Sequence, residues 1–288
     1  AGGGGKGIRR VESVEEFEHQ FVTARQEALQ AFGNADVYME RIIYPAKHIE
    51  IQILADQHGN VVHLGERDCT IQRRHQKLIE ESPSAGIDSK TREKMGKFAS
   101  KLVKGIGYDS VGTLEFLVDK SMNFYFMEMN TRIQVEHTIS EEITGVDLVK
   151  EQIRVAAGEK LSISQKDIHI NGHVIECRID SENGFLPSSG TLETYIPSGG
   201  IGVRIDSHSY QNYEIPPYYD SMIAKLIVKG KNREEAISRM KRALREFIIE
   251  GVDTTIPFHL KVLDNEDFKK GTVYTNFIET HFKEVLGK

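Results

Sequence analysis

The chain has 288 residues, enough to bury a sizeable core, and ordinary domain sizes predict roughly two domains. Its 37 Lys and Arg against 43 Asp and Glu give a net charge of −6, so nucleic acid and anionic membranes are excluded as partners. No apolar run approaches the roughly 20 residues that span a bilayer, and Cys69 and Cys177 lack metal-ligand spacing. We therefore expect a soluble, cytoplasmic protein that holds any anion locally.

The glycine cluster in the opening stretch AGGGGKGIRR is typical of a loop between two strands, so we expect the chain to be a fragment of a longer protein. The cluster matches G-x-G-x-x-G, but four consecutive glycines match many patterns. It is not a Walker A loop, because Lys6 is followed by Gly7 and not by Ser or Thr. Its bare backbone N–H groups can approach phosphate oxygens closely, and the alternative is a flexible linker.

Four segments show helical spacing of apolar residues, at 13–32, 90–104, 147–157 and 232–250. In the first segment Ser13 and Glu16 form a capping box and Gly33 is the stop. In the last, Asn232 is the cap and Gly251 the stop.

Alternating polar and apolar residues predict strands at 48–54 and 174–180, and the more apolar run 222–228 predicts a buried strand. The turn residues DQHGN at 56–60 predict a hairpin after the first of these. Helices interspersed with hairpins favour an α+β fold with antiparallel sheets. The polar stretch near 160–168 predicts the domain break.

Two apolar runs between Gly112 and Asn130 flank DKSMN, which predicts a hairpin that turns at Ser121 and Met122. In that register Leu117 faces Phe126 and Glu115 faces Glu128. Opposed carboxylates destabilise a hairpin unless a cation lies between them, and hard oxygen ligands suit Mg²⁺ or Mn²⁺. Asn130 supplies a third oxygen. The alternative is a solvated acidic face.

The stretch FMEMNTRIQVEHT at 126–138 continues this pattern and predicts a strand. Its polar face would carry Glu128, Asn130, Arg132, Gln134 and Glu136, a series suited to the floor of a cleft.

The segment GERDCTIQRRHQKLIEESP gathers Arg67, Arg73, Arg74, His75 and Lys77 on an acidic protein, which indicates a site for a small anion. The alternative is a solvated helix or loop with ion pairs of its own. A glycine loop for phosphates, a two-carboxylate metal hairpin and neighbouring cations together indicate an ATP-dependent enzyme.

These residues resemble biotin carboxylase over essentially the whole chain, through GGGGKGI, HIEIQI, GERDCTIQRRHQK, MEMNTRIQVEH, ITGVDLVKEQ, GHVIECRI and PPYYDSMIAKLI. The resemblance implies the C-terminal part of an ATP-grasp domain over 1–165, with its lid at 1–44. A biotin carboxylase C-terminal domain with mostly antiparallel sheet would follow over 166–288. It implies carboxylation of biotin by bicarbonate and MgATP through carboxyphosphate.

The resemblance also implies roles for particular residues. Nucleotide contacts would come from Gly2, Gly3, Gly4, Gly5, Lys6, Gly7, Glu40, Arg41, Ile42, Ile43, His48, Gln72 and His75. Magnesium would be held by Glu115, Glu128 and Asn130, and bicarbonate by Lys77, Arg132, Gln134 and the backbone of Val135. Glu136 would be the general base, and Arg178 would stabilise the enolate-like ureido ring of biotin.

The sequence departs from the family in lacking the N-terminal domain, the lysine upstream of the glycine loop and an M-K-M biotinylation site. A separate biotin carboxyl carrier protein is therefore implied, with a carboxyltransferase as further partner and a homodimer as the assembly. The acceptor would be acetyl-CoA, as in fatty acid biosynthesis, or propionyl-CoA or pyruvate. The alternatives are another ATP-grasp ligase, or a folded fragment without catalytic activity.

Overall fold

The computed structural model describes residues 7–73, 75–184 and 186–283. It divides into two compact units, one formed by residues 1–44 and 73–76 and the other by residues 45–72 and 77–288. None of the described helices is both long and apolar enough to cross a membrane.

The first unit contains one long helix, α1 (Val14–Phe32), which ends at Gly33 in the left-handed conformation, as the sequence predicts. The predicted capping box is wrong, because the Ser13 side chain caps no backbone N–H. Glu16 instead accepts a hydrogen bond from the backbone N–H of Glu12, at 3.4 Å. Within this unit the guanidinium of Arg10 lies over the ring of Tyr44, 4.9 Å from its centroid.

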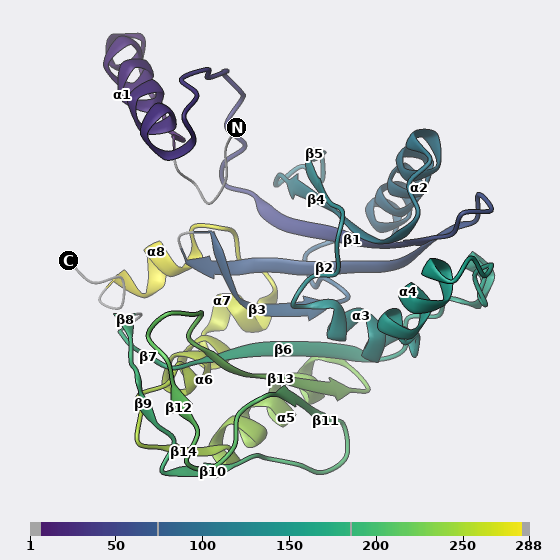
Figure 1. Ribbon diagram of the computed structural model, residues 1–288, viewed down its shortest axis with the longest axis vertical. Coiled ribbons are helices and arrows are strands. Elements are labelled where there is room, and N and C mark those ends of the chain that lie inside the picture. Colours follow the sequence, from purple (N-terminus) through teal and green to yellow (C-terminus); the bar gives the residue numbers. More distant parts are fainter. Residues whose placement is uncertain (1–6, 74, 185, 284–288) are drawn as a thin grey trace. The chain divides into compact units, whose positions relative to one another are not determined.

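The second unit is built on an eight-stranded sheet with the order β11-β13-β6-β3-β2-β1-β4-β5, which Figure 1 shows as a continuous stack of ribbons. Every pairing whose register the structure describes in this sheet is antiparallel. The strands are β1 (Lys47–Ala55), β2 (Val61–Arg73), β3 (Gln76–Ser82), β4 (Ser110–Val118), β5 (Phe124–Asn130), β6 (His173–Asp180), β11 (Val203–Ser207) and β13 (Met222–Gly230).

Six short strands form three two-stranded ribbons outside the main sheet. They are β7 (Glu182–Asn183) with β8 (Leu186–Pro187), β9 (Gly190–Thr191) with β12 (Glu214–Ile215), and β10 (Thr194–Ile196) with β14 (Ile248–Glu250).

The remaining helices of the second unit pack around the sheet. They are α2 (Ser89–Ile106), α3 (His137–Thr144), α4 (Leu148–Ala156), η1 (Gln165–Asp167), α5 (Arg233–Glu246), α6 (Ile256–Asp264), α7 (Glu266–Lys270) and α8 (Phe277–His281).

The two faces of strand β1 serve different purposes. Ile49, Ile51 and Ile53 are buried against Met95 and Ala99 of α2. His48, Glu50 and Gln52 alternate with these isoleucines, are polar and also buried, and point to the opposite face. The predicted period of two is confirmed, and it delivers a polar row into the interior of the unit.

The predicted helix at 232–250 is wrong in its last turn. Helix α5 ends at Glu246, and residues Ile248–Glu250 form strand β14, which pairs with Thr194–Ile196. Two consecutive isoleucines favour a strand over a helix, and the pairing supplies backbone hydrogen bonds that the helix would otherwise have made.

Candidate active site

The polar rows of β1 and β4 meet across an antiparallel pairing in which Glu50 lies directly opposite Glu115. His48, Glu50 and Gln52 alternate along β1 and are all buried. His48 Nε2 lies 3.0 Å from Glu115 Oε2. The site therefore begins with two opposed carboxylates in the middle of a sheet.

Glu115 also lies directly opposite Glu128 of β5, so the predicted register of the two glutamates is confirmed. The predicted turn is wrong by one residue, because Leu117 pairs with Tyr125 and not with Phe126. The backbone N–H of Asp119 donates to Asn123 O at 3.0 Å, which leaves three residues in the turn. A β-bulge at Met127, between the pairs of Phe116 and Glu115, restores the register.

The strand predicted over residues 126–138 is also wrong. Strand β5 ends at Asn130, a loop follows, and helix α3 begins at His137 with Glu136 as its N-cap residue. The loop and the helix start carry Gln134 and Glu136 back over the sheet, where both are buried. Tertiary packing, and not strand alternation, brings these polar residues together.

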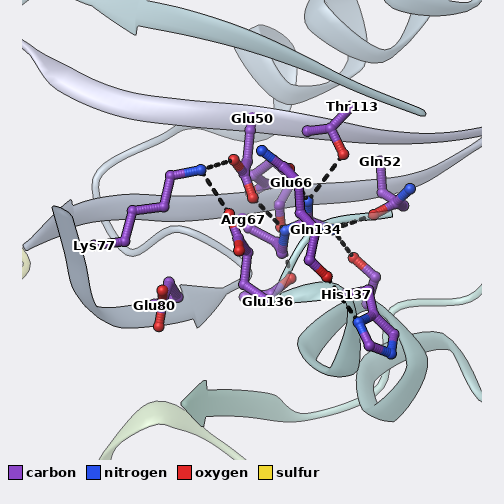
Figure 2. A network of polar contacts seen from close by, with 12 residues as sticks. Glu50, Gln52, Glu66, Arg67, Lys77, Glu80, Thr113, Gln134, Glu136 and His137 are labelled. Atoms are coloured by element: carbon purple, nitrogen blue, oxygen red, sulfur yellow. Dashed lines mark hydrogen bonds and ion pairs between the residues drawn. The ribbon is translucent and has the colours of Figure 1, made fainter. Parts of the chain in front are cut away.

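Arg67 of β2 is the centre of the network, and its side chain is fully buried (Figure 2). Its Nε donates to Glu50 and its Nη1 to Gln52, and Nη1 also reaches Ser140 Oγ at 2.9 Å. Its Nη2 donates to Thr113 Oγ1 at 3.2 Å and to Gln134 Oε1 at 3.0 Å. The sequence predicts Arg67 as part of an anion site, but its guanidinium is occupied by protein acceptors.

The ammonium of Lys77 lies among three carboxylates, and Figure 2 shows it directed at two of them, Glu50 and Glu136. Its Nζ is 2.6 Å from Glu50 Oε2, 3.1 Å from Glu115 Oε1 and 2.6 Å from Glu136 Oε1. Burial works against its charge, but these carboxylates, Glu50 first, raise the pKa of Lys77 above its usual range. Lys77 is therefore a permanent cation at the junction of β1, β3 and α3.

Two of the carboxylates around Lys77, those of Glu50 and Glu115, are held ionised in return. Burial disfavours the charged form of Glu50, but Arg67 and then Lys77 lower its pKa to about 2. Against burial, the hydrogen bond from His48 and the charge of Lys77 lower the pKa of Glu115 to about 2 as well.

Arg178 of β6 completes the set on the other side of Glu136. Its Nη2 donates to Glu136 Oε2 at 2.9 Å and its Nε to Glu80 Oε1 at 2.7 Å. The backbone carbonyl of Arg178 accepts from Thr255 Oγ1 at 2.9 Å and lies 2.6 Å from His259 Nε2. Both ends of Arg178 are thus fixed, and Glu136 has one cation on each oxygen.

Among the predicted nucleotide residues, His48 and Gln72 lie together, with Gln72 Nε2 3.4 Å from His48 Nδ1. Residues 2–6 lie outside the described residues. Gly7, His75 and residues 40–43 belong to the first unit. Their nucleotide roles stay predictions.

The predicted bicarbonate residues divide into two groups. Lys77 and Gln134 join the network, and Gln134 Nε2 donates to Glu115 Oε1 at 2.8 Å. The Val135 carbonyl accepts from Lys225 Nζ at 2.9 Å. Arg132 is exposed and donates to Ile133 O at 3.1 Å and to Asn130 Oδ1 at 3.4 Å, so the structure does not bring it to Glu136.

The donor set at the acidic hairpin fits a hard divalent ion, because Glu115, Glu128 and Asn130 offer oxygens on facing positions of β4 and β5. Asn130 Nδ2 donates to Glu115 Oε1 at 3.0 Å. A different trio, His48, Glu50 and Glu115, has possible ligand atoms within 4.8 Å of one another. The ammonium of Lys77 bonds two of its carboxylates, so we favour the hairpin.

Several residues of the network were not predicted, namely Glu50, Arg67 as a buried group, Glu80 and Lys225. Glu176, which faces Glu80 and accepts a hydrogen bond from Thr138, was not predicted either. Glu50 and Glu176 carried a signal, since each stands on the polar side of a strand that alternates strictly. Cross-strand neighbours that are far apart in sequence gave no signal of their own.

Two family models match the chain. The model described as the ATP binding domain of the carbamoyl-phosphate synthase L chain matches residues 1–164, and the biotin carboxylase C-terminal domain matches residues 176–280.

The sequences of curated relatives align with almost the whole of this chain. Biotin carboxylase 1 of Bacillus subtilis is 57% identical over 291 residues, which is 100% of this chain and 64% of the relative. The biotin carboxylase of a Nostoc species is 57% identical over 282 residues, which is 97% of this chain and 63% of the relative. The chain thus spans less than two thirds of the length of these relatives.

Solved structures agree. The biotin carboxylase complex with βγ-ATP from Campylobacter jejuni superposes with a TM-score of 0.94 at 51% identity, over 97% of this chain and 63% of that one. The biotin carboxylase domain dimer of the Hydrogenobacter thermophilus 2-oxoglutarate carboxylase, with MgADP, ADP and bicarbonate, gives 0.94 at 51% identity. It matches over 100% of this chain and 64% of that one.

Proposed function

The chain belongs to the biotin carboxylase family, and from this premise we propose that the protein carboxylates biotin with bicarbonate at the expense of ATP, through carboxyphosphate. The observation that carries the proposal is the buried carboxylate of Glu136, held at 2.6 Å by Lys77 and at 2.9 Å by Arg178. One base between two cations is an arrangement suited to binding a small anion and removing its proton.

Bicarbonate is itself an anion, so it competes with Glu136 for the same cations. When Lys77 and Arg178 turn part of their hydrogen bonding to the substrate, a lone pair of Glu136 becomes available as the base. The proton passes from the bicarbonate O–H to a carboxylate oxygen of Glu136, and the resulting dianion is the stronger nucleophile toward a γ-phosphate. Gln134 keeps Arg67 and Glu115 in place beside it.

Arg178 carries the second step in this proposal. Its guanidinium lies at the edge of the cluster, and a planar cation is suited to stabilising the enolate-like oxygen of the biotin ureido group. Thr255 and His259 fix the backbone carbonyl of Arg178, so its reach is limited to the side chain.

Glu115, Glu128 and Asn130 would hold Mg²⁺ or Mn²⁺, and a bound ion would neutralise phosphate oxygens of ATP during transfer. The chain's own residues orient Glu115 for binding such an ion. Glu115 shares its Oε1 among Lys77, Asn130 and Gln134, so a carboxylate orientation is already imposed before an ion arrives.

The proposal extends to the organisation of the chain. A partial ATP-grasp domain at 1–165 with its lid at 1–44, followed by a biotin carboxylase C-terminal domain at 166–288, is supported by the residues that the two family models match. Biotin would arrive on a carrier protein and leave carboxylated for a carboxyltransferase. The dimer seen for the Hydrogenobacter relative supports a homodimer. A cytoplasmic location is also a proposal, since some relatives are chloroplastic.

Biotin-dependent release of ADP from MgATP and bicarbonate tests the proposal. We expect the rate to rise on adding biotin and to fall at least about 100-fold in Glu136→Gln. The matched control is Glu93→Gln, which changes an exposed glutamate of α2 that pairs with Lys97. It is expected to leave the rate unchanged.

The outcomes separate the rival functions. ATP cleavage that ignores biotin in every variant would favour another ATP-grasp ligase. A folded protein that neither cleaves ATP nor binds it in calorimetry would contradict the proposal.

A further inference from the structure

Within the strand registers that the structure describes for the main sheet, glutamates lie directly opposite one another at three places. Glu50 faces Glu115 between β1 and β4, and Glu115 faces Glu128 between β4 and β5. The third pair is Glu80 and Glu176, between β3 and β6. Carboxylates in such positions repel each other, and the repulsion grows with burial unless a positive group lies between them.

The first pair has a positive group between its members, and the second pair would have one in the proposed metal ion. The ammonium of Lys77 lies 2.6 Å from Glu50 and 3.1 Å from Glu115. Glu115 and Glu128 form the proposed metal hairpin, where Glu128 is exposed.

The third pair has no such bridge. Arg178 donates to Glu80 Oε1 at 2.7 Å and to Glu136 Oε2 at 2.9 Å. Among the hydrogen bonds and ion pairs of the described residues, none joins a cation to Glu176. Its one polar contact there is the hydroxyl of Thr138, which donates to Oε2.

Both side chains are completely buried, with 0% of their surface exposed. Glu80 Oε2 and Glu176 Oε1 are buried without a hydrogen-bond partner within the described part of the chain. Two full negative charges with two unsatisfied oxygens would be strongly unfavourable at this depth. One proton changes the balance, because it removes a charge and supplies an O–H donor for the facing carboxylate.

We propose that Glu80 and Glu176 share a single proton, carried mainly by Glu176, and that this pair positions Arg178. The positioning part rests on the proposed function, in which Arg178 acts beside biotin. Glu176 is the better carrier because Glu80 already pairs with a guanidinium. Both are positioning residues, since they touch Arg178 and Thr138 and not a substrate.

The titration behaviour of the two groups agrees with this geometry. Burial first, and then the charge of Glu80, raise the pKa of Glu176 to about 8. Burial also raises the pKa of Glu80 to about 7, although Arg178 opposes it. The charges of Lys225 and Arg178 oppose the rise in the pKa of Glu176. Further titratable or charged groups that interact with the pair are Lys77, Cys69, Cys177, Asp180 and Glu136.

The shared proton determines how many negative charges surround the guanidinium of Arg178. With one proton in the pair, Glu80 presents a single negative charge to Nε and Nη2, and Glu136 presents another to Nη2. The guanidinium is therefore balanced between two carboxylates and held in one orientation. Removing Glu80 leaves Glu136 as the stronger partner, so Arg178 should turn toward it.

Infrared difference spectroscopy of the purified chain tests the shared proton directly. A protonated carboxyl has a carbonyl stretch that shifts in D₂O, and we expect this band in the wild-type protein near neutral pH and its loss in Glu176→Gln. The band should disappear as the pH rises through about 8. Asp180→Asn is the matched control, because burial raises the pKa of Asp180 to about 7 and its own band must be subtracted.

A second variant guards against a failure of Glu176→Gln to fold. Thr138→Val removes the hydroxyl that stabilises ionised Glu176, so the band should persist to higher pH than in the wild type. A wild-type spectrum without a band that Glu176→Gln or Thr138→Val alters would overturn the proposal.

The pH dependence of the unfolding midpoint tests the shared proton independently of infrared spectroscopy. The pKa of Glu176 is raised above its usual 4.5, so the folded state keeps a proton that the unfolded state releases. The stabilisation is complete below about pH 4.5 and is lost as the pH rises through about 8. The unfolding midpoint of the wild type should therefore fall relative to Glu176→Gln over this range, and parallel curves would count against the pair.

Kinetics then separate this inference from the function on which it rests. If ADP release depends on biotin, Glu80→Gln should raise KM for biotin about tenfold and leave KM for ATP unchanged. The infrared band requires no substrate. An active enzyme without the band would overturn the shared proton alone, and the band in an inactive enzyme would overturn the proposed function alone.

Discussion

Glu50 and Glu176 occupy equivalent positions in two parts of the same sheet, and their acidities move in opposite directions. Each is completely buried, and each faces another glutamate on the neighbouring strand. Glu50 is bonded by Arg67 and Lys77, which lower its pKa to about 2 against the effect of burial. Glu176 receives one hydroxyl, and burial with the facing Glu80 raises its pKa to about 8.

Depth alone therefore does not decide the charge of a buried carboxylate. The number of cations in direct contact decides it, because desolvation is common to both sites. The sheet balances opposed carboxylates with an ammonium at one place and, as we propose, with a proton at the other.

The largest expected effect follows from removing the ammonium of Lys77, which lies between Glu50 and Glu115. Lys77→Met leaves Glu50, Glu115 and Glu136 without their shared cation, and we expect a loss of about 3–5 kcal/mol in the free energy of unfolding. Urea denaturation measures it. The control is Lys97→Met on the surface of α2, which should not change stability. Equal effects of the two variants would remove the basis of the comparison.

The pH dependence of stability distinguishes Glu50 from Glu176, because the pKa of Glu50 is lowered and that of Glu176 is raised. The lowered pKa of Glu50 means that its stabilisation is present above its usual value of 4.5 and is lost as the pH falls toward about 2. This loss amounts to about 3 kcal/mol. In Glu50→Gln the acid branch of the stability curve should become shallower, measured by urea denaturation across that range. Glu176→Gln should leave the acid branch below pH 4.5 intact and alter the neutral range.

The pair of buried Glu115 and exposed Glu128 gives the smallest effect. Without divalent ions, Glu128→Gln should stabilise the protein by about 0.5 kcal/mol, because it relieves the repulsion from Glu115. With Mn²⁺ and ADP, the wild-type Tm should rise and that of the variant should rise less. An identical rise in both proteins would show that Glu128 is not a metal ligand.

The local elements were predictable from the sequence, because period-two alternation in β1 and β6 reflects a physical division between two faces and the apolar run of β13 reflects burial. The hairpin of Glu115 and Glu128 was predicted correctly for these residues, although the turn is longer and a bulge at Met127 compensates. Turn length and bulge depend on a few degrees of backbone torsion, which residue types constrain weakly.

Only part of the candidate active site could be predicted from local sequence patterns. Glu50 and Glu115 are 65 positions apart, and Glu80 and Glu176 are 96 apart, so their pairing depends on strand order and not on local pattern. The environment of Arg67 is the opposite of the one expected from the sequence. A charged residue in a basic segment is expected at the surface, whereas Arg67 is fully buried. Its burial follows from partners on β1, β4 and α3 that no local window contains.

The pairing of β3 with β6 also bears on how the molecule can be divided. Strand β3 lies within the first segment that a family model matches, and β6 begins at His173, just before the second matched segment. The two strands are nevertheless hydrogen-bonded neighbours in one sheet. A cut between the segments would leave each half with a long uncovered strand edge, the kind of surface that drives intermolecular aggregation. Separately expressed halves should therefore be insoluble alone and should recover a native-like sheet when refolded together.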